Sequence, residues 1–253
     1  MHLVERLREE AMQAARETGN PTLKSVTIGI NFTLAELSDG RAGIAYTNPE
    51  GGGAGDVEGY LGKPAGEALG LLSSPRGLAA STGLAVANAL LNTVGGGGYG
   101  DPVLRIVSSM GPGRAVLIGF FKAYVKHLLE RGWEVTVHEL RPFYSPEGAT
   151  LLPWWALDST LPRADLVIVT GSSLANRSLA LLEELLRQAP GVKVMVGPST
   201  PRSRVLLGVF HALGYSIVRD PEGCRRLVTL GYDAPVLFRR RCLEKATWAP
   251  HGQ

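Results

Sequence analysis

Glycine and hydroxyl residues follow directly after two short apolar segments in the second half of the chain. Thr170-Gly171-Ser172-Ser173 follows the first segment, and Gly197-Pro198-Ser199-Thr200 follows the second. Each turn leads into a predicted helix, whose first N–H groups have no partner within the helix and attract anionic oxygens. Each turn taken alone favours simple helix capping. Two such turns on successive strands favour a crevice that binds a carboxylate or another anion.

An acidic residue at a third predicted strand end raises the question of a nucleotide. Glu139 lies about 20 residues beyond Gly119, a spacing typical of the acid that holds a ribose in dinucleotide-binding folds. The glycine fingerprint of those folds is missing, because Gly119 is followed by Phe120 and Phe121, whose rings would obstruct a pyrophosphate. The sequence therefore argues against a nicotinamide or flavin cofactor. An adenosyl cofactor depends less on this fingerprint and stays open.

Neither a metal site nor a nucleophile has a local signature in this chain. The histidines are His2, His127, His138, His211 and His251. They form no His-x-His or His-x3-His pair, and no Gly-x-Ser-x-Gly motif is present. Cys224 and Cys242 are too few and too widely spaced for a disulfide framework, so we interpret them as reduced packing residues. Carboxylate ligands from distant segments would leave no signature, and no residue stands out as a general base.

Two predicted strands near the amino terminus carry a polar face. Strict alternation over residues 26–34 is typical of a half-buried strand, and Asp39-Gly40 predicts the turn into a partner strand over residues 42–46. Pairing these strands places the polar residues of this segment on the face opposite the apolar one. These residues are Asn31, Thr33 and Thr47.

Helices complete the first half as a small α+β unit. Apolar spacing and small residues predict helices over residues 3–15, 64–72 and 76–91. Asn88 and Asn92 share one face of the last helix, where they form either the polar edge of a cleft or an ordinary exposed surface. A glycine-rich stretch over residues 94–102 ends this unit. We therefore divide the chain into residues 1–100 and 101–253.

The second half has the pattern of a doubly wound parallel sheet. Its predicted strands alternate with helices, and those over residues 115–119 and 166–169 are short and continuously apolar, which is typical of strands buried on both faces. The strands are predicted over residues 115–119, 134–139, 166–169, 192–196 and 215–218. The last helix between them is predicted over residues 201–213. Ligands of such sheets bind beyond the carboxyl ends of the strands, which is where the polar turns lie.

Composition argues against several functional classes. With 45% hydrophobic and 19% charged residues the chain is an ordinary folded protein, and no apolar run reaches the roughly 18 residues of a membrane span. The amino terminus lacks the apolar core of a signal peptide, so we expect a cytoplasmic protein without membrane contact. The net charge is +3 and the one tight basic run is Arg239-Arg240-Arg241, which argues against nucleic-acid binding. A homodimer is the default expectation.

Four segments of the chain resemble the signature blocks of a known family. They are Ile28-Gly29-Ile30-Asn31-Phe32-Thr33-Leu34, Gly43-Ile44-Ala45-Tyr46-Thr47, Val167-Ile168-Val169-Thr170-Gly171-Ser172-Ser173-Leu174-Ala175-Asn176 and Gly197-Pro198-Ser199-Thr200-Pro201. In this order, along almost the whole chain, they are similar to the uncharacterised family labelled putative heavy-metal chelation. The resemblance implies an amino-terminal domain similar to that of enolase, a Rossmann-like second domain and an active site between them. Arg177 stands where the family usually has glycine, and Phe32 stands where it tends to have tyrosine.

We therefore predict an α/β protein that binds a small polar or anionic ligand in a cleft between two domains. The resemblance implies a heavy-metal ion or a metal chelate as that ligand. The predicted lining residues are Asn31, Thr33, Thr47, Gly119, Glu139, Thr170, Gly171, Ser172, Ser173, Asn176, Gly197, Pro198, Ser199 and Thr200. The alternative is an enzyme that acts on a small metabolite with a nucleotide or adenosyl cofactor in the same cleft. A pure interaction protein is a third hypothesis, and the concentration of small polar residues at strand ends argues against it.

Overall fold

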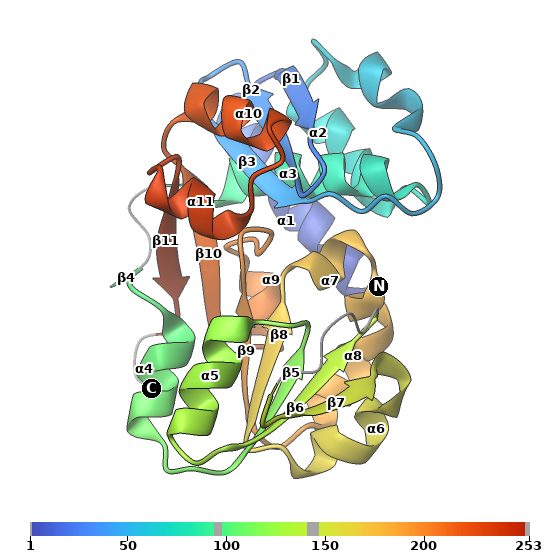
Figure 1. Cartoon of the computed structure of the whole chain (residues 1–253). Coiled ribbons are helices and arrows are strands. Elements are labelled where there is room, and N and C mark those ends of the chain that lie inside the picture. Colours follow the sequence, from blue (N-terminus) through green and yellow to red (C-terminus); the bar gives the residue numbers. More distant parts are fainter. Residues whose placement is uncertain (1, 94–97, 141–146, 251–253) are drawn as a thin grey trace.

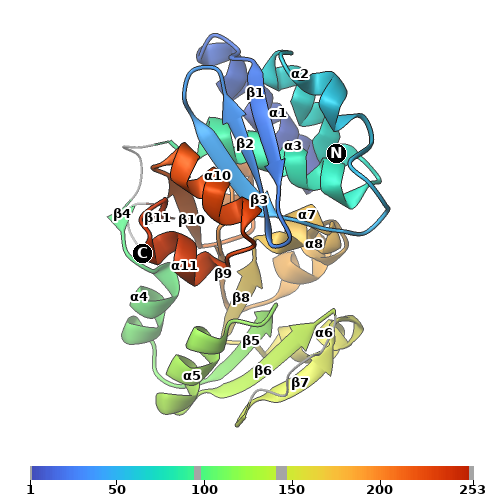
Figure 2. The same cartoon turned by 45° about the horizontal axis from the view of Figure 1, so that its top comes forward.

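The computed structural model describes residues 2–93, 98–140 and 147–250, and these residues form two β-sheets (Figure 1). A three-stranded sheet has the order β1-β2-β3, and an eight-stranded sheet has the order β4-β11-β10-β9-β8-β5-β6-β7. Figures 1 and 2 show the small sheet and its helices seated at one end of the large sheet. No helix in these three stretches of chain is long and apolar enough to span a bilayer. Residues 94–97 of the predicted boundary, and His251, lie outside the described residues.

The small sheet is antiparallel. Its strands are β1 (Leu23–Ile28), β2 (Phe32–Leu37) and β3 (Ala42–Tyr46). The single strand predicted over residues 26–34 is wrong, because the chain reverses between β1 and β2. A side chain at Gly29 would lie 2.3 Å from the carbonyl oxygen of Val228, so the reversal requires glycine there. The apolar alternation continues through the turn because Ile30 stands at its tip, where it is 79% exposed.

One long helix covers one face of the small sheet. The helices of this unit are α1 (Leu3–Glu17), α2 (Ala65–Ala68) and α3 (Gly77–Leu91), with 3-10 helices over Gly55–Tyr60 and Leu69–Ser73. A Cβ atom at Gly43 would lie 2.2 Å from the carbonyl oxygen of Ala85, so β3 and α3 meet backbone to backbone. A Cβ atom at Gly83 would lie 2.2 Å from the amide nitrogen of Leu72. Glycines on β3 and α3 therefore allow the close packing of this helix against its neighbours.

The large sheet is doubly wound, as predicted. Its parallel strands are β5 (Arg114–Ile118), β6 (Glu134–Glu139), β7 (Thr150–Pro153), β8 (Leu166–Thr170), β9 (Val192–Val196) and β10 (Ala212–Val218). The chain first builds β5-β6-β7 in one direction and then returns to add β8-β9-β10 on the other side. This is the strand order of Rossmann folds, and it reverses between β5 and β8. Two antiparallel strands, β11 (Leu243–Trp248) and β4 (Gly98–Tyr99), extend the sheet beyond β10.

The helices of the large unit vary widely in length. They are α4 (Pro102–Ser109), α5 (Lys122–Glu130), α6 (Leu157–Thr160), α7 (Ser172–Ala175), α8 (Ser178–Gln188), α9 (Arg204–Leu207), α10 (Pro221–Thr229) and α11 (Ala234–Arg239), with 3-10 helices over Trp154–Ala156 and Leu161–Arg163. The helix predicted over residues 201–213 is wrong beyond α9. The amide of His211 donates to the carbonyl of Lys193 at 2.8 Å, so the chain already pairs beside β9 at that point.

Residues 219–242, between β10 and β11, leave the large sheet and cover the second face of the small one (Figure 2). We call them the C-terminal excursion. Its helix α10 packs against β1 and β2, where Glu36 accepts two hydrogen bonds from Arg225, from Nε at 2.8 Å and Nη2 at 2.7 Å. The small sheet is therefore buried between α3 and a helix contributed by the end of the chain.

A disulfide closes the C-terminal excursion. Cys224, in α10, and Cys242, just before β11, have Cα atoms 5.2 Å apart and are bonded. The interpretation of these cysteines as reduced packing residues is wrong, because the two helices between them fold back and bring the ends of the segment together. Both side chains are buried in the apolar cluster that joins α10 and α11 to β2 and β3.

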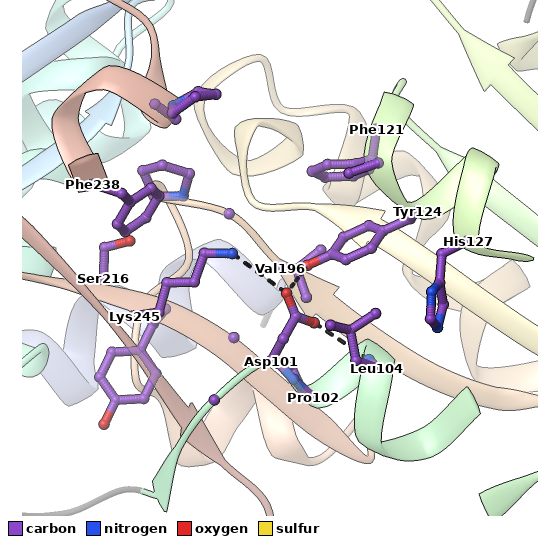
Figure 3. Close-up of a pocket in the computed structure, with 18 of the residues that line it drawn as sticks. Asp101, Pro102, Leu104, Phe121, Tyr124, His127, Val196, Ser216, Phe238 and Lys245 are labelled. Atoms are coloured by element: carbon purple, nitrogen blue, oxygen red, sulfur yellow. Dashed lines mark hydrogen bonds and ion pairs between the residues drawn. The ribbon is translucent and has the colours of Figure 1, made fainter. Parts of the chain in front are cut away.

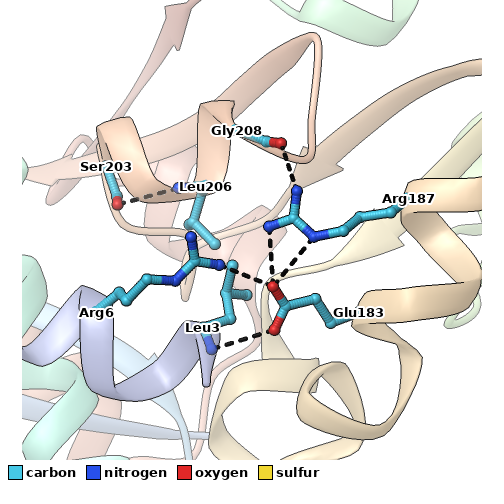
Figure 4. A network of polar contacts seen from close by, with 7 residues as sticks. All are labelled: Leu3, Arg6, Glu183, Arg187, Ser203, Leu206 and Gly208. Carbon is cyan, nitrogen blue, oxygen red and sulfur yellow. Dashed lines mark hydrogen bonds and ion pairs between the residues drawn. The ribbon is translucent and has the colours of Figure 1, made fainter. Parts of the chain in front are cut away.

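Helix α1 ties the small unit to the large one on another side (Figure 4). The Glu183 carboxylate, in α8, accepts hydrogen bonds from the amide of Leu3 at 3.1 Å, from Arg6 Nη2 at 2.7 Å and from Arg187 Nη2 at 2.9 Å. Glu10, also in α1, accepts from the amide of Arg204 at 2.8 Å at the start of α9. The two units are therefore fastened by α1 as well as by α10.

Candidate functional site

A cavity of about 910 Å³ opens on one side of the large sheet (Figure 3). Its walls come from the start of α4, from the β5–α5 connection and α5, and from α11. Its floor comes from the end of β9 and from β10 and β11. The volume is typical of small-molecule binding sites. Every described residue that lines it falls between Gly100 and Ala246, so this cavity belongs to the large unit.

Several residues on the floor of the cavity have small side chains or none. Gly197 ends β9, and Gly214 and Ala246 lie on β10 and β11. A Cβ atom at Gly214 would lie 3.0 Å from Cγ of Pro102, so glycine lets the start of α4 approach the sheet. Gly197 has a φ of +119°, a conformation that glycine adopts readily.

Asp101 is the polar centre of the cavity. One carboxylate oxygen, Oδ1, accepts from the amides of Val103 at 3.1 Å and Leu104 at 3.4 Å and so caps α4. The other, Oδ2, accepts from the hydroxyl of Tyr124 at 2.7 Å and lies 3.5 Å from Nζ of Lys245. Three hydrogen bonds and one ion pair therefore already engage this carboxylate.

Tyr124 is a hydrogen-bond donor in this cavity. Burial raises the pKa of its phenol, and the negative charge of Asp101 and the hydrogen bond to Asp101 raise it further. The phenol therefore keeps its proton at neutral pH. It positions Asp101 and cannot act there as a base.

Aromatic rings stand on two sides of the cavity. On the α5 side the ring centroids of Phe121 and Tyr124 are 5.3 Å apart with an interplanar angle of 47°. Phe238 stands on the α11 side, and Nζ of Lys245 lies 5.4 Å from the centroid of its ring. Figure 3 shows Lys245 and Asp101 between these two aromatic groups.

Two of the predicted site residues line this cavity, and they are Gly197 and Pro198. Gly119 directly precedes the lining residue Phe120 and has a φ of +99°. A Cβ atom on Gly119 would lie 2.7 Å from Cγ2 of Thr170, so the ends of β5 and β8 meet there. The structure thus places these strand ends beside the cavity.

The predicted serine-rich turn is closed by its own hydrogen bonds. Thr170 Oγ1 lies 3.0 Å from Ser172 Oγ, and the Ser173 hydroxyl donates to the Thr170 carbonyl at 2.7 Å. Asn176 Oδ1 accepts from the amide of Ser178 at 3.0 Å. A Cβ atom on Gly171 would lie 2.5 Å from Thr200 Oγ1, which brings the two predicted turns into contact. Ligand binding by this turn stays a prediction.

The remaining predicted residues lie where the two units touch or within the small sheet. Ser199 Oγ accepts from the amide of Tyr46 at 2.7 Å, across the junction of the units. The hydroxyls of Thr33 and Thr47 are buried and lie 2.9 Å apart. Asn31 Nδ2 donates to the Gly231 carbonyl at 2.8 Å. Their role in ligand binding likewise stays a prediction.

Asn88 and Asn92 are neither a cleft edge nor an exposed surface. Both are buried, and their amides cross from α3 to the large unit. Asn88 Nδ2 donates to the Ser199 carbonyl at 3.1 Å. Asn92 Nδ2 donates to the carbonyls of Thr200 at 3.0 Å and Ser216 at 3.1 Å, and its Oδ1 accepts from the amide of Arg202 at 2.7 Å. These amides hold the units together.

Glu139 reaches the loop after β5, as its spacing from Gly119 suggests. Its Oε1 accepts from the amide of Phe120 at 2.9 Å, and its Oε2 accepts from the amide of Leu140 at 2.9 Å. The carboxylate therefore stands beside the first strand end of the Rossmann sheet. The sequence at that strand end is Gly119-Phe120-Phe121, without the further glycines of a dinucleotide fingerprint.

The described residues do not suit a bare metal ion. They contain no group of three or more histidine, cysteine, aspartate or glutamate side chains that could hold one. Both cysteines are in the disulfide. Burial lowers the pKa of His138, whose Nδ1 donates to the Pro153 carbonyl at 2.9 Å while Nε2 lies 2.9 Å from Thr160 Oγ1. The ring of His138 is thus held neutral inside the protein.

Sequence reasoning missed most of the cavity. Asp101 precedes Pro102, a combination typical of a helix start, and this signal was available. Tyr124 has no sequence signal that indicates a role in a site. Phe238 and Lys245 belong to α11 and β11, elements that the sequence pattern did not predict.

Comparison with known proteins identifies relatives of both units. A family model described as putative heavy-metal chelation (DUF364) matches residues 103–247, and a second model with the same description (DUF4213) matches residues 9–91. No curated protein gave a significant match.

Two solved structures share the fold over nearly the whole chain. A protein from Desulfitobacterium hafniense is 23% identical, with a TM-score of 0.78 over 95% of this chain and 98% of its own. One from Pyrococcus horikoshii is 20% identical, with a TM-score of 0.77 over 98% and 99%. Both are described as DUF364 proteins of unknown function.

Proposed function

This chain belongs to the family described as putative heavy-metal chelation, and from that premise we propose that it binds a small organic anion in the cavity between α5 and α11. A heavy metal would enter this site already held by the organic molecule, as a metal chelate. The donor atoms around the metal then come from the ligand. The protein supplies positive charge and apolar surface.

The balance of charge around the cavity carries this proposal. Lys122, Lys126 and Lys245 line it, and Asp101 is the only acidic side chain among the described lining residues. Lys126 also forms an ion pair with Glu130, outside the lining, at 3.8 Å, so Lys122 and Lys245 carry most of the positive charge that a ligand meets. Asp101 is engaged by three hydrogen bonds and one ion pair, so it offers little to a cation. An incoming anion meets the ammonium groups without an unpaired carboxylate to repel it.

The chemistry of the described side chains favours a chelate over a bare ion. A heavy metal needs several nitrogen, sulfur or oxygen ligands at short range. The described part of the chain gathers no such set, and its cysteines are oxidised. The cleft between the units, with Ser172 and Asn176 at its edge, is the other location that we predict for the ligand.

Native mass spectrometry of gently purified protein tests the proposal. We expect an organic anion to be released on denaturation, with metal present only in proportion to it by elemental analysis. Lys245→Met should reduce retention of this molecule at least tenfold. Lys63→Met is a matched control, because Nζ of Lys63 also lies 5.4 Å from an aromatic centroid, that of Tyr60, outside the cavity.

Other outcomes would contradict the proposal in distinguishable ways. One equivalent of zinc, nickel or copper bound without any organic mass would overturn the chelate. Loss of retention in the Ser172→Ala/Asn176→Ala double variant, with full retention in Lys245→Met, would move the ligand to the junction of the units.

A small-metabolite enzyme with a nucleotide or adenosyl cofactor is the second candidate. Two features favour it, the Rossmann strand order and the carboxylate of Glu139 beside the first strand end. Glu139→Ala should then weaken nucleotide binding by about 1–3 kcal/mol, the cost of leaving a buried polar group unpaired. The first experiment is titration of the unmodified protein with adenine nucleotides and S-adenosyl compounds. If none of them binds with measurable affinity, this candidate function is excluded.

A further inference from the structure

We infer that the ligand is a flat aromatic acid, whose ring system enters between Phe238 and the Phe121–Tyr124 pair and whose acidic group reaches Lys245. This inference rests on the proposed function, since it names the class of organic anion that the same cavity selects. It follows from the arrangement of rings, charges and small residues around the cavity.

The aromatic side chains come from separate elements and stand apart. Phe121 and Tyr124 lie at the start of α5, and Phe238 lies in α11 (Figure 3). These rings are only partly buried, so part of their surface is free to contact a ligand. Aromatic rings favour offset-stacked or edge-to-face partners. A planar aromatic ligand can stack on, or meet edge to face, the rings on both walls, whereas a saturated ring makes only van der Waals contacts with them.

The floor of the cavity also favours a flat molecule. Gly197, Gly214 and Ala246 carry no side chain longer than a methyl group, although Val196, Tyr215, Ser216 and Lys245 of the same strands also line the cavity. A thin, wide ligand can therefore lie along the strands. The volume of about 910 Å³ leaves room for more than one fused ring.

Lys245 marks the place of the acidic group. Its ammonium lies 3.5 Å from Asp101 Oδ2 and 5.4 Å from the centroid of Phe238, at the edge of the space between the rings. Asp101 holds the ammonium on one side, and Tyr124 holds Asp101 through its hydroxyl, so both are positioning residues. An ammonium has three donors, so Lys245 can keep Asp101 and still pair with a ligand carboxylate.

The same charges disfavour cationic aromatic ligands. Lys122 adds positive charge to the α5 wall, as does Lys126, which lies 3.8 Å from Glu130. Asp101 offsets only part of this repulsion, because it contributes a single negative charge and is already paired with Lys245. The cavity therefore distinguishes an aromatic acid from an aromatic amine of the same shape.

Four small probes separate shape from charge. They are 2-naphthoate, decalin-2-carboxylate, 2-naphthalenemethanol and 2-naphthylmethylammonium, which share one skeleton and differ in flatness or charge. By isothermal titration calorimetry on the full chain, 2-naphthoate should bind at least fivefold more tightly than either the saturated acid or the neutral alcohol. The ammonium compound should bind most weakly.

Two substitutions assign the preferences to residues. Phe238→Leu should weaken 2-naphthoate at least fivefold and change the saturated acid less than twofold. Lys245→Met should weaken both acids at least fivefold and leave the alcohol unchanged, and Lys63→Met should change none of the four. Nuclear Overhauser effects between naphthoate and aromatic protons of the unmodified protein check the location, whether or not the Phe238 variant folds.

The outcomes separate this inference from the proposed function. Equal affinity for the flat and the saturated acid, both lost in Lys245→Met, would overturn the aromatic preference and leave the binding of organic anions standing. No binding of either acid, together with no organic mass released from purified protein, would overturn both. Tighter binding of the ammonium compound than of the acids would also overturn both.

Discussion

Removing the side chain of Asn92 should destabilise the junction of the two units. In the folded protein its amide group makes three hydrogen bonds, to the carbonyls of Thr200 and Ser216 and from the amide of Arg202, at 2.7–3.1 Å. The side chain is 5% exposed, so water has little access to replace it. Asn92→Ala removes all three bonds at once.

The expected loss follows from the net value of a buried hydrogen bond. At about 1 kcal/mol each, three bonds give a loss of about 3 kcal/mol in the free energy of unfolding. For a chain of this size that corresponds to a fall of about 6–12 °C in Tm. Asn92→Asp should be at least as damaging, because its carboxylate faces the carbonyls of Thr200 and Ser216 and has no proton to donate.

Urea denaturation and thermal scanning measure this loss. Gln188→Ala is the control, because this exposed amide donates to Glu184 on the same helix at 2.8 Å and its removal should cost less than about 0.5 kcal/mol. An Asn92→Ala variant within about 1 kcal/mol of the unmodified protein would refute the reasoning. It would mean that the bonds across the junction contribute no net stability.

Three further changes have predictable effects. Arg177 has a φ of +62°, so Arg177→Gly should be about 1 kcal/mol more stable than Arg177→Ala in urea denaturation, and equal stability would contradict the backbone argument. Hydrogen bonds from Arg225 lower the pKa of Glu36. The ionised carboxylate therefore contributes stability above about pH 4.3, and this stability is lost as the pH falls through the lowered pKa. Glu36→Gln should flatten the acid side of the plot of unfolding free energy against pH. A profile of unchanged slope would refute that assignment. Cys224→Ser/Cys242→Ser should lower the free energy of unfolding by about 3 kcal/mol under non-reducing conditions, and an equal loss with dithiothreitol present throughout would contradict a disulfide.

The sequence predicted the part of the fold in which each element carries its own pattern. Buried parallel strands such as β8 are continuous apolar runs between turn residues, and this pattern has few alternatives. The strand over residues 26–34 was predicted wrongly because the exposed Ile30 continues the alternation through a turn. Gly29 is the true signal, and its meaning depends on Val228, about 200 residues further along the chain.

The candidate site was harder to predict for a related reason. The rule that ligands gather at strand ends found Gly197 and Pro198, because that rule depends on topology alone. Asp101, Tyr124 and Lys245 come from three separated segments and share no spacing. These residues contact one another because α4, α5 and β11 pack together in the folded protein. No local sequence pattern predicts that packing.

The backbone conformation of Arg177 agrees with the family resemblance of the sequence. The resemblance implies glycine at this position, and the backbone here adopts the left-handed conformation that glycine favours. A glycine would therefore fit this conformation. The arginine adopts it with some strain.

The covering of the small sheet by α10 has a consequence for the order in which the protein is made. β3 ends at residue 46 and α10 begins at residue 221. The second face of the small sheet therefore stays uncovered until roughly 175 further residues have been synthesised. At about 5–20 residues per second, the ribosome needs about 10–35 s to produce them. Throughout that interval Leu34 and Ile44 have no partner helix and stay open to chaperones or to other nascent chains. The small unit is thus translated before the large unit, yet it is completed only after most of the large unit has been made.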